Sequence, residues 1–152
     1  MKLRRSVLVS VAVSCAALGM LAVSARAAAP AGHFTNLGDG TVRDNLTGLV
    51  WQQGFSSATQ NLGDSAAYCS TPTGPSGGGW RLPTVAELQT LVDETVMTPS
   101  IDSAYFPSTT PNWFWSSTPV PGSELDGWAV TFAGGGTGRA GGSFRCRARC
   151  VR

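Results

Sequence analysis

The sequence has few charges, one histidine and no lysine after Lys2. Charged residues make up 13% of its 152 residues, which argues against a coiled coil and against charge-driven disorder. The single histidine, His33, leaves a zinc site or a thiol nucleophile without its usual partners. There are no internal repeats. The 19 glycines and 9 prolines predict many turns, while 5 tryptophans and 6 phenylalanines predict a packed core of one domain.

The first 27 residues have the pattern of a secretory signal peptide. A basic start, residues 1–5, precedes an uncharged apolar run over residues 6–23, and Ala25 and Ala27 supply the small side chains that signal peptidase requires. We expect cleavage after Ala27. The alternatives are an uncleaved membrane anchor, for which the run is nearly long enough, and a lipoprotein modified at Cys15, whose preceding residues form a poor lipobox. The pattern predicts export to the periplasm, the cell surface or the medium, with no membrane span after cleavage.

Removal of the signal peptide changes the charge of the chain. The formal net charge of the whole sequence is +2, but cleavage leaves seven arginines against nine acidic residues, or −2. Residues 28–138 contain all nine acids and two of these arginines, whereas residues 139–152 contain five arginines and no acid. The predicted mature chain is therefore an acidic body with a basic C-terminal end.

Three cysteines, Cys69, Cys146 and Cys150, remain after cleavage. Export makes one disulfide plausible and leaves one cysteine unpaired. Residues 143–151 alternate with a strand period. Two cysteines four residues apart on a strand lie about 13 Å apart, well beyond the roughly 7 Å limit for a bridge. We therefore expect Cys69 to pair with either Cys146 or Cys150, which would stabilise the fold by roughly 4 kcal/mol.

The order of predicted elements indicates an α+β domain. After a leader (28–33), turn residues separate short strands, and the strongest local signal is a capping box formed by Thr84 and Glu87. The glycine-rich residues 134–138 (Gly-Gly-Gly-Thr-Gly) form the predicted turn between the last two strands. The expected strands are 33–36, 41–43, 49–51, 113–118, 127–133 and 143–151, and the expected helices are 64–70, with Asp64 as its N-cap, and 84–93.

Four blocks of sequence carry a family resemblance. They are residues 39–51 (Asp-Gly-Thr-Val-x-Asp-Asn-x-Thr-Gly-Leu-x-Trp), 67–69 (Ala-Tyr-Cys), 80–88 (Trp-Arg-Leu-Pro-Thr-x-x-Glu-Leu), and 115–118 (Trp-Ser-Ser-Thr) with 149–152 (Arg-Cys-Val-Arg). In these blocks and in their order, residues 34–152 resemble the Lcl C-terminal domain family of exported bacterial proteins, long described as a domain of unknown function.

The resemblance implies a C-type lectin-like fold, with two short helices flanking a twisted antiparallel sheet in a single domain, 34–152. The name-giving member of the family is an adhesin whose domain binds sulfated glycosaminoglycans, and most relatives have no assigned activity. The cysteine pair of the family matches Cys69 and Cys150. Cys146 departs from the family pattern and stays an alternative partner of Cys69.

The basic C-terminal end is the candidate ligand site. On a strand, Arg145, Arg147 and Arg149 project from one face, with Arg139 near its end. Guanidinium groups bind sulfate, phosphate and carboxylate bidentately, so an arginine row fits an anionic polysaccharide and carbohydrate-dependent adhesion. The alternatives are a solvated strand face whose charges pair with the acids, and a structural domain that binds an envelope protein. The sequence has no nucleic-acid-binding signature.

Other sites are less well supported by the sequence. The glycine run 134–138 lacks the lysine and following helix of a phosphate loop. Asp39, Asp44 and Asn45 have no calcium-binding register and are interpreted as turn caps. The segment 81–87 also resembles part of formylglycine-generating enzymes, but those enzymes are about twice as long and need a reactive cysteine pair. We therefore expect no enzymatic activity, no cofactor and no metal.

Overall fold

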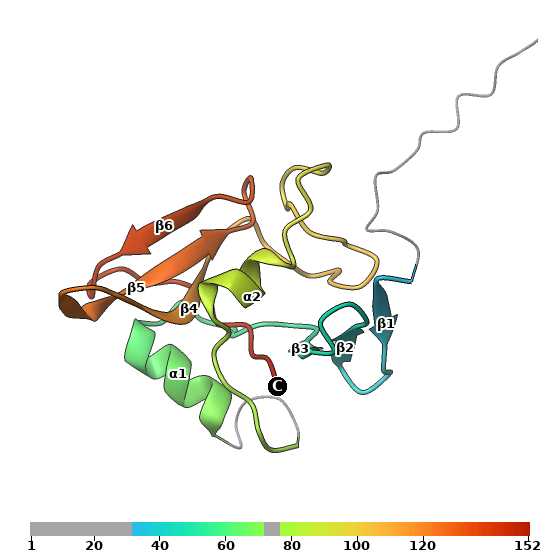
Figure 1. Ribbon diagram of the computed structural model, residues 1–152, viewed down its shortest axis with the longest axis horizontal. Helices are drawn as coiled ribbons and strands as arrows, with labels where there is room; N and C mark the ends of the chain where they lie inside the picture. Colours follow the sequence, from blue (N-terminus) through green and yellow to red (C-terminus); the bar gives the residue numbers. More distant parts are fainter. Residues whose placement is uncertain (1–31, 72–76) are drawn as a thin grey trace, which may run out of the picture.

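The computed structural model describes residues 32–71 and 77–152 (Figure 1). The predicted signal peptide and most of the predicted leader lie outside these residues. The described parts contain no helix with the length and apolar character needed to cross a bilayer. The elements are β1 (Phe34–Asn36), β2 (Thr41–Asp44), β3 (Val50–Gln52), α1 (Leu62–Ser70), α2 (Val85–Gln89), β4 (Trp113–Val120), β5 (Ser123–Thr131) and β6 (Thr137–Ala140).

The strands form two small antiparallel sheets, ordered β1-β2-β3 and β4-β5-β6. Side chains alternate across β4, so Phe114 belongs to one buried cluster and Trp115 to the other. The first cluster joins the two sheets and includes Leu88 of α2, while the second includes Cys69 of α1. The α+β class is confirmed and is consistent with a C-type lectin-like fold, with two small sheets where we expected one.

Both predicted helices are present with different bounds. Helix α1 is capped by Asn61, whose side chain accepts a hydrogen bond from the backbone of Asp64. The predicted N-cap, Asp64, was therefore wrong by one turn, because the amide of Asn61 caps as well as a carboxylate does. Helix α2 has the predicted capping box of Thr84 and Glu87 but ends at Gln89, four residues before the predicted end at position 93.

The predicted strand over residues 143–151 is wrong. Residue 143 lies in a turn, and the rest of the segment makes only isolated bridges, at Cys146, Arg147 and Val151. Its carbonyls at Cys150, Ala148 and Cys146 accept hydrogen bonds from residues 52, 56 and 60. Residues 52–60 thus advance four positions for every two positions of this segment, so the two stretches do not form a continuous ladder. The sequence analysis also missed β6, because it assigned residues 137 and 138 to the preceding glycine turn.

The segment of residues 146–152, hereafter the C-terminal segment, runs through the middle of the molecule (Figure 1). On one side it bonds to residues 50–60, and on the other Val151 pairs with Arg81 and Arg147 pairs with the backbone of β4. It therefore joins the two sheets through its backbone. Both of its faces are covered, so the strand alternation in its sequence does not separate an inner face from a solvent face.

One glycine of the run 134–138 is required by packing. Gly135 has φ of +77°, and a Cβ there would lie 2.5 Å from Val92 Cγ1. The run includes the turn from β5 to β6, where a turn was predicted, and the close approach to the chain after α2 accounts for the glycine at position 135.

Candidate functional site

A disulfide joins Cys69 of α1 to Cys150 of the C-terminal segment, with a Cα–Cα distance of 5.4 Å. This is the pairing that the family resemblance implied. Cys146 is free and buried, and burial raises the pKa of its thiol to about 12. A thiol that stays protonated near neutral pH exchanges poorly with the neighbouring disulfide, so the pairing should persist without rearrangement.

Arg149 is fully buried, with 0% of its surface exposed. Its guanidinium carbon lies 4.8 Å from the ring centroid of Phe106, 5.4 Å from that of Phe114, 5.8 Å from that of Phe132 and 5.9 Å from that of Phe55. The negative faces of aromatic rings attract a cation, and more strongly where water is excluded. These four phenylalanines, hereafter the phenylalanine cage, enclose the buried charge.

The remaining partners of Arg149 are neutral oxygens. Its Nε donates to the carbonyl of Gly54 at 3.1 Å, and its Nη2 donates to Thr109 Oγ1 at 2.7 Å and to the carbonyl of Gln53 at 3.4 Å. Among the described residues no carboxylate forms an ion pair with it, and Nη1 has no hydrogen-bond partner. Desolvation lowers the pKa of Arg149 to about 9. This arginine is therefore part of the core.

The predicted arginine row does not form one exposed face. Arg145 is exposed, Arg147 is half-buried and Arg149 is buried. The expectation that the three side chains share a solvent face was wrong, because the C-terminal segment is covered on both sides. The nearby Arg139 keeps 60% of its side chain exposed, yet it pairs with Asp126.

Arg147 and Arg145 differ in how much of their charge is available. Arg147 donates through Nη1 to the carbonyls of Ser56 and Ser57 and lies 5.5 Å from the ring centroid of Phe55. Arg145 makes no hydrogen bond or ion pair with any other described residue. The exposed part of the predicted site is thus reduced to Arg139 and Arg145, with part of Arg147.

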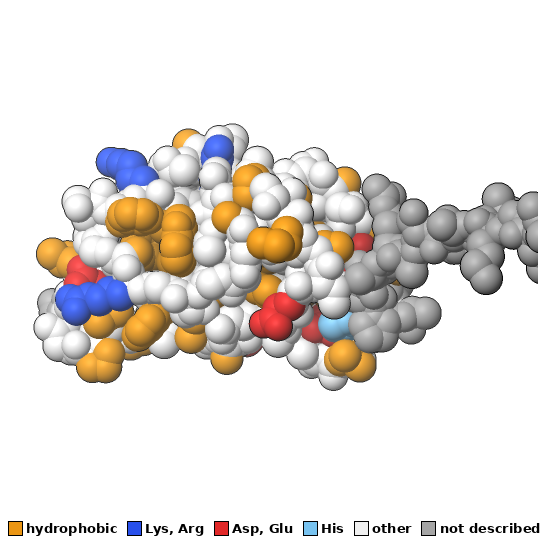
Figure 2. Space-filling view, turned by 90° about the horizontal axis from the view of Figure 1, so that it is seen from above, with side chains coloured by type: hydrophobic (Ala, Val, Ile, Leu, Met, Phe, Trp, Pro, Cys, Tyr) orange, Lys and Arg blue, Asp and Glu red, His pale blue; other side chains and the backbone are white. Residues whose placement is uncertain are grey.

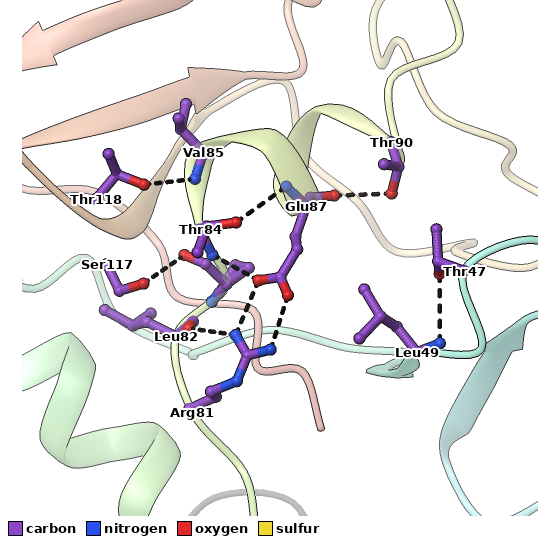
Figure 3. Close-up of polar contacts among 11 residues, drawn as sticks. Thr47, Leu49, Arg81, Leu82, Thr84, Val85, Glu87, Thr90, Ser117 and Thr118 are labelled. Carbon is purple, nitrogen blue, oxygen red and sulfur yellow. Dashed lines mark hydrogen bonds and ion pairs between the residues drawn. The ribbon is translucent and has the colours of Figure 1, made fainter.

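The segment that precedes α2 forms a compact polar cluster (Figure 3). Arg81 binds Glu87 bidentately, with Nη1–Oε2 at 2.8 Å and Nη2–Oε1 at 2.7 Å, while Glu87 Oε2 also accepts from the backbone of Thr84 at 2.7 Å. Thr118 of β4 accepts a hydrogen bond from the backbone of Val85 at 2.9 Å. These groups bond to one another, so the part of the chain that resembles formylglycine-generating enzymes here fixes the start of a helix against a sheet.

This cluster predicts a loss of stability in acid. The hydrogen bond from Arg81 lowers the pKa of Glu87 to about 2, from an ordinary value of 4.5. Its stabilising contribution is therefore complete above about pH 4.5 and is lost as the pH falls toward 2. We expect Glu87→Gln to cost about 1 kcal/mol at pH 7 and almost nothing at pH 2, measured by urea unfolding. A difference that stays constant with pH would contradict this.

The residues once considered as calcium ligands cap turns, as interpreted from the sequence. Asp39 Oδ1 accepts the backbone N–H of Thr41 at 3.1 Å, and Asp44 Oδ1 accepts that of Leu46 at 2.9 Å. Asn45 donates to the carbonyl of Gly32 at 2.8 Å. Within residues 32–71 and 77–152, no group of three or more His, Cys, Asp or Glu side chains is placed to hold a metal ion.

A cleft of about 150 Å³, hereafter the acidic cleft, lies between β1 and the chain that follows α2. His33, Phe34, Asp93, Glu94 and Asp102 line it, and no lysine or arginine of the described residues does. The ring of His33 stacks on that of Phe34 with a centroid distance of 4.1 Å. Figure 2 shows acidic side chains beside the single histidine at one end of the molecule, and the arginines visible on this face lie away from that end.

Neither the phenylalanine cage nor the acidic cleft was predicted from the sequence. The rings of the cage come from residues 55, 106, 114 and 132, and the acids of the cleft lie some 60 positions after His33. No spacing in the sequence brings such distant residues together. The only local sign that Arg149 is buried is its position between the apolar residues Ala148 and Cys150. Arg147 also stands between a cysteine and an alanine, so this sign does not distinguish the two arginines.

A comparison with protein-family models matches residues 40–152 to the Lcl C-terminal domain. The chain belongs to the Lcl C-terminal domain family. The match covers more than half of the chain and lies inside the predicted domain, 34–152. A comparison with curated proteins gives no match.

The blocks by which the Lcl C-terminal domain was recognised meet at the C-terminal segment. Trp51 and Arg81, from the first and third blocks, each form a bridge with Val151 of the last block. Trp51, Trp80 and Trp115, which stand in these blocks, are all buried. The conspicuous residues of the Lcl C-terminal domain in this chain therefore build its core, and a ligand site must be sought on the surface around them.

Proposed function

We propose that this Lcl C-terminal domain is an exported, non-catalytic binding module for an anionic glycan. The observation that carries the proposal is the exposed Arg145, which has no partner among the other described residues and is close in sequence to Arg139, itself 60% exposed in its side chain. Free guanidinium groups bind sulfate and carboxylate groups through paired hydrogen bonds.

The loop that carries Arg145 is held against β5. Asp126 Oδ1 accepts the backbone N–H of Gly142 at 3.2 Å, and Asp126 Oδ2 binds Arg139 through Nε at 3.0 Å. One carboxylate thus fixes the loop and also orients the neighbouring arginine. Because Asp126 offsets part of the charge of Arg139, we expect weak binding that depends strongly on salt.

A heparin column tests the proposal. The wild type should be retained at low salt, and Arg145→Ser and Arg139→Ser/Arg145→Ser should elute progressively earlier, the double variant at or below about 0.15 M salt. Arg43→Ser is the matched control, because Arg43 is an exposed arginine on β2 and its replacement removes the same charge. A wild type that flows through, or a control that shifts as far as Arg145→Ser, would refute glycan binding at this end.

A second candidate function is an interaction domain for a protein of the cell envelope. It is favoured by two exposed apolar side chains near the same arginines, Leu125 with 74% and Phe144 with 47% of their surface exposed. A Cβ at Gly142 would lie 3.1 Å from that of Leu125, so the loop of residues 141–144 packs beside it. A pull-down in which Leu125→Ser/Phe144→Ser loses one protein partner, together with a blank glycan array, would favour this function.

A further inference from the structure

The acidic cleft is separate from Arg139 and Arg145 of the proposed glycan site. The residues that line it include hydrogen-bond acceptors that form no hydrogen bond within the described fold. Asp93 Oδ1 accepts the backbone N–H of Thr95 at 2.9 Å, but its Oδ2 is buried and has no partner. Asp102 is 7% exposed, and its Oδ1 accepts the backbone N–H of Ala104 at 2.9 Å. No hydrogen bond is formed by its second oxygen among the described residues. Each carboxylate is thus held in place through one of its two oxygens, and both residues line the cleft.

The third unused atom belongs to His33. Its Nε2 lies 3.4 Å from Asp44 Oδ1, and its Nδ1 is buried without a partner. In the tautomer of a neutral imidazole that donates from Nε2 to this carboxylate, Nδ1 is an acceptor. Buried polar atoms without partners are costly and uncommon, and the two at Asp93 and His33 belong to residues that line the same cleft.

The charge around the cleft selects a cation. Glu94 adds a third carboxylate to its lining, and no described lysine or arginine lines the cleft. A metal ion is a poor fit, because no group of three or more potential ligands among the described residues is arranged to hold one. A primary ammonium group fits better: it carries one positive charge and three donors, which the oxygens of Asp93 and Asp102 and the Nδ1 of His33 can accept.

We propose that the acidic cleft binds a primary ammonium group, presented by a lysine side chain or by an amino sugar. The stacked rings of His33 and Phe34 form one wall, against which the carbon atoms next to the ammonium group pack. The volume of about 150 Å³ admits the end of such a ligand and not a whole sugar chain or peptide. The cleft therefore recognises one charged group of a larger partner.

Amide chemical shifts of the ¹⁵N-labelled protein, purified after export, test this inference. The probes are Nα-acetyl-lysine amide and glucosamine, and their controls are the same molecules acetylated on the amine. We expect the amine probes to shift the backbone amides of residues 90–94 and 102–105, and the acetylated probes to leave them unchanged. A response to the lysine probe alone identifies a protein ligand, and a response to glucosamine alone identifies an amino sugar.

Asp93→Asn keeps the oxygen that accepts from Thr95 and replaces the unused oxygen by a donor. We expect it to weaken binding of the amine probe about tenfold. Asp39→Asn, with the same charge change on the exposed β1–β2 turn, should bind like the wild type. If Asp93→Asn does not fold, Glu94→Gln at an exposed position should still weaken binding about two- to threefold.

Three results would overturn the proposal. They are equal shifts with acetylated probes, unchanged affinity in a folded Asp93→Asn variant, and a response of the same amides to micromolar calcium with none to either amine. The heparin result does not bear on this site, because the arginines tested there do not line the cleft.

Discussion

Replacement of Arg149 by alanine is expected to lower the free energy of unfolding by about 3–5 kcal/mol. The substitution opens a cavity inside the phenylalanine cage and removes the donors that satisfy the carbonyl of Gly54 and the hydroxyl of Thr109. It also removes the attraction between the cation and four rings. Urea unfolding at pH 7, followed by tryptophan fluorescence, measures the change.

Two further variants separate charge from shape. Arg149→Lys keeps the charge but lacks the planar group that reaches both oxygens, so we expect it to lose about 2–3 kcal/mol. Arg145→Ala removes an exposed arginine of the same chain and should change stability by no more than about 0.5 kcal/mol. If Arg149→Ala and Arg145→Ala unfolded at the same urea concentration, the buried arginine would not stabilise the core.

Loss of the disulfide is expected to have a similarly large effect. Cys69 and Cys150 are 81 residues apart, and closing a loop of this length restricts the unfolded chain by about 4–5 kcal/mol in the chain-entropy model. We therefore expect Cys69→Ser to unfold at much lower urea concentration than the wild type. Reduction of the wild type by dithiothreitol should reproduce the change.

Cys146→Ala is the control for the disulfide. It removes a buried sulfur but leaves the bond between Cys69 and Cys150 intact, so the expected loss is about 1 kcal/mol. Equal stability of Cys69→Ser and Cys146→Ala, or a wild type whose midpoint is insensitive to dithiothreitol, would contradict the prediction.

The two large effects have a common origin in the C-terminal segment. Cys150 ties it to α1, Arg149 anchors it in the phenylalanine cage, and its backbone pairs with both sheets. Its residues are therefore committed to the fold. The proposed ligand contacts are therefore on the surface, at Arg139 and Arg145, on and after β6, near one end of the molecule and at the acidic cleft, beside β1, near the other.

Local signals in the sequence predicted local structure well. The capping box of Thr84 and Glu87 and the turn at Gly135 are present as expected, because each depends on residues within one turn of the chain. Boundaries were less accurate: Asn61 caps α1 in place of Asp64, since amide and carboxylate caps differ little in free energy.

The disulfide was only partly predictable from the sequence. Strand geometry excluded a bond between Cys146 and Cys150, but it did not choose the partner of Cys69. The family resemblance chose Cys150, and the structure confirms that choice. Cys146 and Cys150 are indeed not bonded to each other, but the premise of that exclusion was incorrect, because residues 143–151 do not form a strand.

The sequence by itself determined the α+β class, the family, the capping box and the small set of cysteine pairings. Only the tertiary structure decided which arginine is buried, because burial depends on the rings at positions 55, 106, 114 and 132 that close around Arg149. It likewise assembled the acidic cleft from His33 and acids far along the chain. Alternation along a segment shows which side chains share a face, but whether that face meets water depends on what packs against it.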